Sequence, residues 1–460
     1  MNKKGGAVMS KNRNFRRRQL SATRVIALVF FGIIALGTVL LALPVASRNG
    51  QSCGVLTALF TATSSTCVTG LVMADTYTQW SGFGQTVILC LIEVGGLGFM
   101  SAASVVVFLL RKKVSLRQRM VMAQALSVSD MDGIVRLQKW VLQGSLLIQG
   151  CGALVLFFRF LPEYGVGLAV KWGVFHSVSA FCNAGFDIFG QIAPGQSVAV
   201  FQSDPVVLIT LMALVVLGGL GFFVWEEVAT VRSWRKYSVY TKLVLLSTGI
   251  LILGGAGLVM LLEWNNPATL GAMPWGDKIL NSFFQSVTMR TAGFASFDQG
   301  ALTDGGKVAS ILLMVVGGSS GSTAGGVKTV TVMVVALFLL ARLRGRSNVS
   351  VFRRNVPKEK LLDAMTILMM VAGLAVVGSL VICTTSGVSF VDALYEAVSA
   401  LATVGVTTGI TPTLSVVSKI LLIVFMYFGR VGILTVSLGF LMGDRATERY
   451  RYADTNLLIG

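Results

Sequence analysis

Eight long apolar segments constrain this sequence more than any other feature. A helix crosses a bilayer core of about 30 Å with about 20 apolar residues, and seven segments have that length and composition: 25–46, 87–110, 140–158, 206–225, 243–262, 364–383 and 420–441. An eighth, 308–340, is longer and rich in glycine. Because 54% of the 460 residues are hydrophobic and 13% are charged, the chain has more apolar surface than a soluble globule buries. The sequence predicts an all-α membrane protein with eight transmembrane helices.

The basic residues predict how these helices are oriented. The chain has a net charge of +18, and 29 of its 38 Lys and Arg residues fall in five regions: 3–24, 111–139, 232–242, 342–360 and 445–451. These regions lie at the N-terminus, after every second apolar segment and at the C-terminus, which is the positive-inside pattern of cytoplasmic loops. We therefore predict that both termini are cytoplasmic and that no nucleic acid is bound. A specific acidic partner is the alternative explanation of the charge.

Acidic residues gather on the opposite side. Eight of them fall in the connections that this topology places outside: Asp75, Glu163, Asp187, Asp204, Glu263, Asp277, Asp298 and Asp304. An acidic mouth concentrates cations, whereas ordinary solvated loop charge is the alternative for any one residue. Two of the group, Asp187 and Asp298, follow glycines that recur through the chain.

Those glycines mark a fourfold repeat. Four short apolar stretches, each too short to cross a membrane, begin with an aromatic residue ten positions before a glycine: 60–70, 175–185, 283–293 and 395–405. The glycines recur after 115, 108 and 112 residues, and a second glycine cluster follows in each next helix: Gly95-Gly96, Gly218-Gly219, Gly318 and Gly429. We predict four copies of helix, half-helix, glycine turn and helix.

The repeat divides the chain into eight parts. The boundaries are a basic arm 1–23, repeat 1 at 24–111, a cytoplasmic loop 112–138, repeat 2 at 139–235, repeat 3 at 236–345, a cytoplasmic loop 346–359, repeat 4 at 360–443 and a cytoplasmic tail 444–460.

Four glycine turns at membrane depth predict a pore. Non-helical backbone survives there only inside protein or around water, so the turns should meet at one axis. Carbonyl oxygens facing that axis can replace the hydration shell of an alkali cation, and the C-terminal ends of the half-helices favour a cation. No Asp or Glu occupies the glycine positions, which argues against a calcium or magnesium pore.

The loop residues resemble a known family. The sequences Thr-Cys-Val-Thr-Gly at 66–70, Asn-Ala-Gly-Phe at 183–186, Arg-Thr-Ala-Gly-Phe at 290–294 and Thr-Val-Gly at 403–405 are similar to the pore loops of the Trk/Ktr/HKT superfamily of potassium transporters. Over 24–443 the chain looks most like the bacterial Ktr membrane subunit. This resemblance implies a potassium selectivity filter made by Thr66, Cys67, Val68, Thr69, Gly70, Asn183, Ala184, Gly185, Thr291, Ala292, Gly293, Thr403, Val404 and Gly405.

The resemblance also implies partners and a location. It predicts a homodimer in the bacterial cytoplasmic membrane, each chain with its own pore, and a separate cytosolic ring of nucleotide-binding regulatory subunits. The chain's own loops lack a nucleotide-binding fingerprint, so no organic cofactor is expected. Potassium at the filter is the expected transported ion, and sodium is a candidate activator.

A glycine-rich break is expected in the eighth apolar segment. Five glycines and four hydroxyl residues make a helix weak there: the residues are Gly317, Gly318, Ser319, Ser320, Gly321, Ser322, Thr323, Ala324, Gly325 and Gly326. We predict an obstructing loop below the filter, which the family resemblance supports as a gate. A phosphate-binding loop is less favoured because Val327 precedes Lys328. A glycine face for helix packing is the third possibility.

Arg430 is the second candidate gate residue. It lies inside the last apolar segment, where a charge is costly unless it faces water or a partner. A guanidinium on the pore axis would repel cations and donate to carbonyls of the broken segment, whereas an ion pair with Glu93 is the structural alternative. Lys328 is expected to snorkel toward the cytoplasm, and a role similar to that of Arg430 is the alternative. His176, in a half-helix, is interpreted as a packing or hydrogen-bonding residue and not a proton relay.

The sequence offers no basis for catalysis. No nucleophile motif, paired carboxylates or His/Asp/Ser arrangement has useful spacing, and the six cysteines form neither a disulfide framework nor a metal site. Two transport alternatives remain: a sodium-selective pore, and a transporter of organic solutes, which would instead use inverted repeats.

Overall fold

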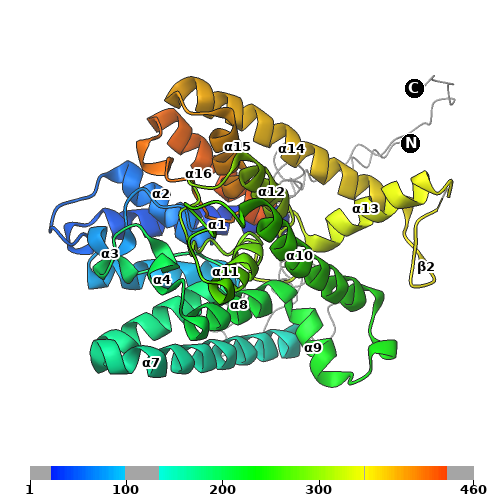
Figure 1. Ribbon diagram of the computed structural model, residues 1–460, viewed down its shortest axis with the longest axis horizontal. Coiled ribbons are helices and arrows are strands. Elements are labelled where there is room, and N and C mark those ends of the chain that lie inside the picture. The colour runs from blue at the N-terminus through cyan, green and yellow to red at the C-terminus, as the bar shows by residue number, and fades with distance from the viewer. Residues whose placement is uncertain (1–21, 99–133, 347, 433–460) are drawn as a thin grey trace, which may run out of the picture.

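The fold was analysed in a computed structural model, which describes residues 22–98, 134–346 and 348–432. The described chain is mostly helical (Figure 1), as predicted. Four helices are long and apolar enough to cross a membrane, or five if one sharply bent pair is counted as a single span. The predicted basic arm 1–23, the loop 112–138, the tail 444–460 and the ends of the second and last apolar segments lie wholly or mainly outside the described residues.

Among the residues that the structure describes, the elements form a succession of helices with one two-stranded hairpin. In order they are α1 Ala22–Ala42, η1 Pro44–Ala46, α2 Val55–Thr66, α3 Thr76–Gln79, α4 Gly82–Gly96, α7 Ile134–Phe181, η2 Phe189–Gln191, η3 Ser197–Phe201, α8 Pro205–Leu220, α9 Phe222–Thr230, η4 Trp234–Lys236, α10 Val239–Glu263, α11 Trp275–Thr288, α12 Asp304–Val315, α13 Thr329–Leu343, β1 Ser350–Val351, β2 Arg354–Asn355, α14 Lys358–Ser386, α15 Phe390–Leu401, η5 Thr411–Thr413 and α16 Val416–Val431.

Each repeat has a long helix, a half-helix and an inner helix. The half-helices are α2, the end of α7, α11 and α15, and the inner helices are α4, α8, α12 and α16. In the second repeat α7 joins the long helix to the half-helix, and the backbone turns between them at Gly165, with a φ of 74°. Buried side chains of the half-helices form the centre of the packing, because these helices are surrounded by the others.

Two inner helices are interrupted. The break predicted in the third repeat separates α12 from α13. The expectation of one continuous span over 206–225 was wrong, because α8 and α9 meet at an angle of 94°. The turn falls on Gly221, whose φ of 93° is unfavourable for any residue with a Cβ.

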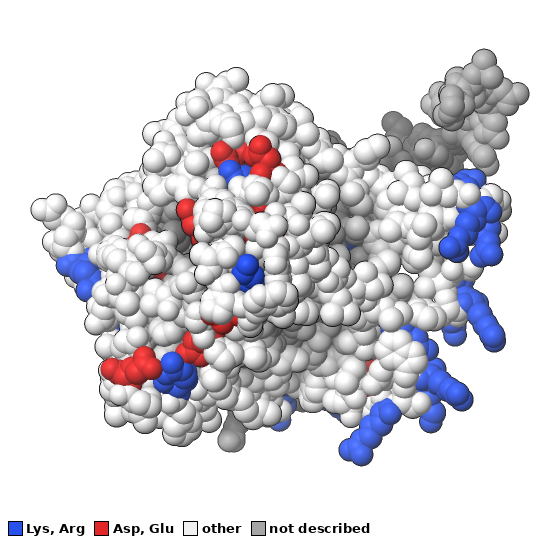
Figure 2. Space-filling view, in the orientation of Figure 1, with Lys and Arg blue, Asp and Glu red and all other residues white. Residues whose placement is uncertain are grey.

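The charges of the described residues are separated along the molecule. In Figure 2, Lys and Arg gather at the end formed by α9, the start of α10, the end of α13 and the β1–β2 hairpin, while Asp and Glu lie toward the other end. This distribution matches the two-sided charge bias read from the sequence.

Candidate pore and gate

Every half-helix ends in the same backbone turn. The residue two positions before each repeat glycine has a positive φ, although none of the four is glycine: Val68 (55°), Asn183 (59°), Thr291 (65°) and Thr403 (52°). The left-handed region costs an L-residue about 1–2 kcal/mol. Four copies in the same register therefore mark a conformation that the surrounding structure imposes.

Hydroxyl side chains of the half-helices hold these turns. In each repeat one hydroxyl is bonded to the backbone at or just beyond the repeat glycine: Gly70 N to Ser64 Oγ (3.0 Å), Ser179 Oγ to Phe186 O (2.7 Å), Thr288 Oγ1 to Phe294 O (2.6 Å) and Gly405 N to Ser399 Oγ (3.0 Å). The extended backbone that follows each half-helix is thus held by a buried hydroxyl group of that same half-helix.

The four repeat glycines close a ring. A methyl group placed on each would meet the carbonyl oxygen that precedes the glycine of another loop: Gly70 against Ala184 O (2.5 Å), Gly185 against Ala292 O (2.8 Å), Gly293 against Val404 O (2.7 Å) and Gly405 against Thr69 O (1.8 Å). The contacts run from loop one to two, three, four and back to one. Four carbonyls from equivalent positions therefore surround one axis with no room for side chains.

A cavity of about 880 Å³ opens onto this ring. All four repeat glycines line it, together with Asp75, Asp187 and Asp298. All three carboxylates are held in place by backbone donors, since Asp75 accepts from Gly195 N at 3.1 Å, Asp187 from Phe189 N at 3.3 Å and Asp298 from Gly300 N at 2.9 Å. The cavity is an acidic vestibule in front of a ring of carbonyls.

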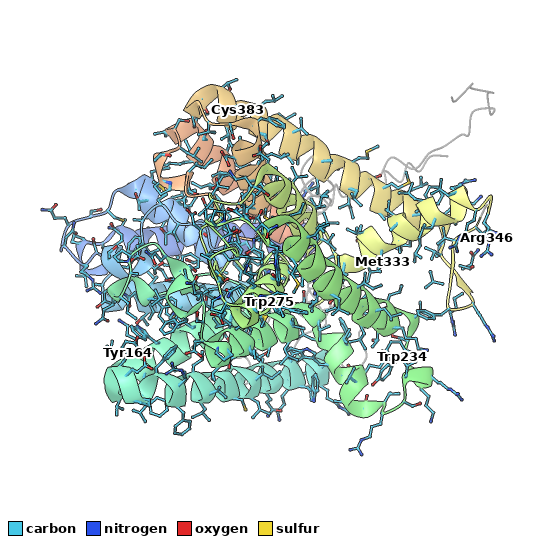
Figure 3. All side chains as sticks on the ribbon, in the orientation of Figure 1. Tyr164, Trp234, Trp275, Met333, Arg346 and Cys383 are labelled. Carbon is cyan, nitrogen blue, oxygen red and sulfur yellow. The ribbon has the colours of Figure 1, made fainter. Side chains whose placement is uncertain are left out.

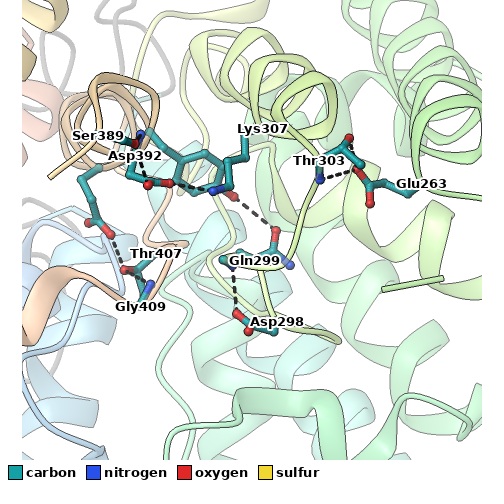
Figure 4. Close-up of polar contacts among 12 residues, drawn as sticks. Glu263, Asp298, Gln299, Thr303, Lys307, Ser389, Asp392, Thr407 and Gly409 are labelled. Carbon is teal, nitrogen blue, oxygen red and sulfur yellow. Dashed lines mark hydrogen bonds and ion pairs between the residues drawn. The ribbon is translucent and has the colours of Figure 1, made fainter. Parts of the chain in front are cut away.

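Polar contacts between repeats three and four stiffen one wall of this vestibule (Figure 4). Lys307 Nζ pairs with Asp392 Oδ1 at 2.8 Å, and Tyr395 donates to Gln299 Oε1 at 3.2 Å. Thr407, which lines the cavity, donates to the buried Glu396. The loop beyond Gly293 is therefore attached to α15 of the fourth repeat, and the loop beyond Gly405 is attached to its own half-helix, α15.

The inner helices pack closely against the ends of the half-helices. In three repeats a glycine of the inner helix faces a carbonyl of the half-helix. A methyl group on Gly95 would lie 2.0 Å from Thr66 O, one on Gly218 would lie 2.0 Å from Phe181 O, and one on Gly429 would lie 2.3 Å from Leu401 O. The third repeat departs from this pattern, because α12 ends at Val315 and the glycine-rich segment follows.

That segment, residues 317–326, crosses to the other repeats. Its backbone bonds to the second repeat, with Ser319 N donating to Gly219 O at 3.0 Å and Thr323 N to Gly218 O at 3.2 Å. At its other end, a methyl on Gly325 would lie 2.1 Å from Thr403 Oγ1. The segment thus lies against the fourth pore loop and the second inner helix at once.

Arg430 joins the glycine-rich segment to the first repeat. Its guanidinium donates to Thr323 O and Gly95 O, and to Gly96 O at 2.9 Å. The alternative ion pair with Glu93 is not formed among the described residues. The Glu93 carboxylate instead accepts from Gln149 Nε2 at 3.1 Å and from Cys182 Sγ at 3.3 Å.

Two further basic side chains lie near these elements. Lys328 Nζ donates to Ala324 O at 2.8 Å, so its ammonium is bound to the glycine-rich segment and does not extend toward the cytoplasm as expected. His176 Nε2 accepts from Ile188 N at 3.2 Å, and the ring stacks on Phe189 with centroids 3.7 Å apart. His176 therefore packs and hydrogen-bonds, as the sequence interpretation held.

Comparison with known proteins agrees with this arrangement. Residues 9–448 match the TrkH family model, described as a cation transport protein. The chain is 37% identical to the potassium/sodium uptake protein NtpJ of Enterococcus hirae over 451 residues, covering 96% of this chain and 98% of that protein. It is also 37% identical to Ktr system potassium uptake protein B of Bacillus subtilis, with the same coverage of 96% and 98%.

The chain belongs to the TrkH family of cation transport proteins. Its fold is also that of the potassium transporter TrkH of Vibrio parahaemolyticus, with a TM-score of 0.72 over 93% of this chain and 86% of the other, at 17% identity. Because this is a family of ion transporters, the chain is a membrane transporter and not an enzyme. The resemblance drawn from the four loop sequences is confirmed.

Sequence reasoning missed one feature that this TrkH family member carries in all four repeats. In each repeat a Gly-X-X-Gly lies at the end of the inner helix or just beyond it, and its second glycine has a positive φ: Gly98 (83°), Gly221 (93°), Gly321 (70°) and Gly432 (94°). The spacing is visible in the sequence and could have predicted a positive-φ glycine in the same register of all four repeats. In this register Arg430 corresponds to Gly96, Gly219 and Ser319.

Proposed function

We propose that this chain takes up potassium through a filter of backbone carbonyls contributed by its four pore loops. The single observation that carries the proposal is the closed ring, in which each repeat glycine packs against the carbonyl of another loop. Neutral carbonyls suit a weakly hydrated monovalent cation and hold it loosely enough to leave. The acidic vestibule raises the local concentration of cations in front of the ring.

Residues 317–326 and Arg430 act as the gate in this proposal. The segment lies against the turn of the fourth pore loop. It takes the place of a continuous helix, because α12 ends at Val315. The Arg430 guanidinium fixes the segment and places a positive charge near the path of the ion. A cation passing the filter would then have to displace the segment before it reached the cytoplasm.

A homodimer in the bacterial cytoplasmic membrane, with both termini inside, completes the proposal. Regulation would come from a separate cytosolic ring of nucleotide-binding subunits that docks on the basic end of the molecule. Two observations support this: basic side chains cluster at that end, and the B. subtilis relative is named as a component of a Ktr system.

Rubidium uptake tests the function directly. A bacterium deficient in potassium uptake should grow at low external potassium when it expresses this chain, and purified protein in liposomes should take up rubidium in preference to sodium. Preferred uptake of sodium would support a sodium pore instead. No uptake of either ion by correctly inserted protein, with and without the regulatory subunit, would contradict the proposal.

Replacing Gly70 with serine is expected to lower the preference for potassium over sodium. The new side chain would meet Ala184 O at 2.5 Å, so one carbonyl must move from its position at the axis. The ratio of rubidium to sodium uptake measures the effect. Gly82→Ser is the matched control, since a side chain at Gly82 meets nothing within 4 Å. Equal ratios of rubidium to sodium uptake in the two variants would mean that Gly70 is not part of the filter.

Asp187 gives an expected pH dependence. Burial and the neighbouring Asp75 carboxylate raise the pKa of Asp187 to about 7. Above that pH the vestibule carries this negative charge, and below it the carboxyl is neutral, so rubidium uptake should fall several-fold as external pH drops from about 8 to about 6. Asp187→Asn should give low uptake at both pH values. Asp304→Asn, outside the vestibule lining, should keep the wild-type profile; an unchanged profile in Asp187→Asn would contradict the assignment.

A further inference from the structure

The turn between α8 and α9 brings cytoplasmic elements against the glycine-rich segment. At Gly221 the chain bends by 94°, and the first residue of α9 bonds to the tip of that segment, with Phe222 N donating to Gly321 O at 2.8 Å. A side chain at Gly221 would lie 2.9 Å from Ser320 O, so the approach requires glycine. The tip of the segment therefore rests on the start of α9.

The same tip is held from a second direction by Tyr240. This residue belongs to the first turn of α10, and its hydroxyl donates to Ser320 O at 2.9 Å. Neighbouring carbonyls, those of Ser320 and Gly321, are thus bonded to two different helices. Three other described side chains outside the segment donate to its backbone, from Arg430, Lys328 and Thr329 to Thr323 O, Ala324 O and Gly317 O. Among these described donors, Tyr240 is the one that reaches the tip, at Ser320 O.

Glu227 ties those two helices together. Its carboxylate accepts from Ser238 N, from Ser238 Oγ at 2.7 Å and from Thr241 Oγ1. Glu227 lies in the last turns of α9, and Ser238 caps the N-terminus of α10. Residues 222–242, which we name the α9–α10 corner, are therefore joined by this carboxylate, and Tyr240 belongs to the corner.

The corner is also in contact with the cytoplasmic hairpin. Lys242 Nζ lies 5.8 Å from the centre of the Phe352 ring, at the turn between β1 and β2. Figure 3 places Trp234 of the corner and Arg346, which precedes the hairpin, at the same basic end of the molecule. A force applied to this exposed end therefore reaches Tyr240 through covalent and packed neighbours.

We propose that Tyr240 is a positioning residue that latches the gate segment to the α9–α10 corner, so that displacement of the corner from the cytoplasmic side releases the gate. The inference rests on the proposed gating function and adds its mechanical coupling. The latch is one hydroxyl on a carbonyl, so it can break without unfolding either helix. It is separate from Arg430, which holds the segment from the first and fourth repeats.

Tyr240→Phe tests the latch with the loss of a single oxygen atom. In liposomes holding the full chain without any regulatory subunit, we expect its maximal rubidium flux per inserted protein to rise about five-fold, the factor that matches one hydrogen bond of about 1 kcal/mol. The rubidium concentration at half-maximal flux should stay unchanged, because the filter is not touched. Tyr237→Phe is the matched control, since Tyr237 lies in the same corner and its ring packs on Trp234.

A second variant separates the latch from general loosening of the fold. In protein lacking residues 319–324, Tyr240→Phe should add no further flux, because its acceptor is gone. Equal flux in Tyr240→Phe and Tyr237→Phe, or an additive effect in the deletion background, would overturn the latch. Those outcomes, with normal rubidium uptake by the unaltered chain, leave the proposed function intact; absent uptake by the unaltered chain refutes the function itself.

Discussion

Replacing Gly405 with alanine is expected to lower potassium uptake by about two orders of magnitude, equivalent to roughly 2.7 kcal/mol. A methyl group at this position would lie 1.8 Å from Thr69 O and 2.8 Å from Gly70 Cα, both of which are backbone atoms. The backbone φ of 91° adds strain for any residue with a Cβ. Since the new atom cannot be accommodated by a rotamer change, the first and fourth loops must separate and the carbonyl ring must open.

Rubidium uptake by purified protein in liposomes measures this loss, with the amount of inserted protein determined separately. Gly373→Ala is the matched control, because Gly373 lies in α14 and a methyl there meets nothing within 4 Å. Uptake by Gly405→Ala within two-fold of this control would mean that the ring of glycines is not the ion path.

Deleting residues 319–324 is expected to raise the maximal ion flux, and this is the largest increase that we predict. The segment is fixed through Ser319 N on Gly219 O, Thr323 N on Gly218 O and the Arg430 guanidinium on Thr323 O. Several hydrogen bonds of about 1 kcal/mol each favour the obstructed state, so their loss should raise maximal flux about ten-fold or more.

Arg430→Gln is expected to raise flux as well, by less, because it removes donors but leaves the segment in place. Arg344→Gln is the control, since Arg344 is exposed beyond the end of α13. Equal or lower flux in a folded and inserted deletion variant would favour the alternative in which the glycine-rich segment serves only for close helix packing.

Much of the architecture is predictable because it repeats. Four copies of an aromatic residue ten positions before a glycine mark the four loops whose carbonyls form the ring, and a repeat in register can be found without knowledge of tertiary contacts. The break after α12 is equally local, since five glycines among ten residues cannot sustain a helix well.

The turn at Gly221 was not predictable from composition. Residues 206–225 are apolar throughout, which is what a continuous span requires. The helix turns there because its backbone is completed by a distant partner, Gly321 O, which accepts from Phe222 N. Only the Gly-X-X-Gly spacing shared with the other inner helices carried a local signal.

The partners of Arg430 could not be predicted from the sequence either. Charge balance makes Glu93 the natural candidate, as the acidic residue inside a span. The guanidinium instead finds carbonyls at Gly95, Gly96 and Thr323, which are exposed by close glycine packing and by a broken helix. Backbone acceptors have no signature in the sequence, because every residue carries one.

The contact of Gly405 with Thr69 and Gly70 joins the first loop to the last. A chain that is inserted into the membrane as it is made places loop one early and loop four near the end of synthesis. Until α15 has entered, Thr69 O has no neighbour on that side, and no complete set of four carbonyls exists. The proposed ion path is thus complete only in the finished polypeptide, and a truncated product would lack part of the ring of carbonyls.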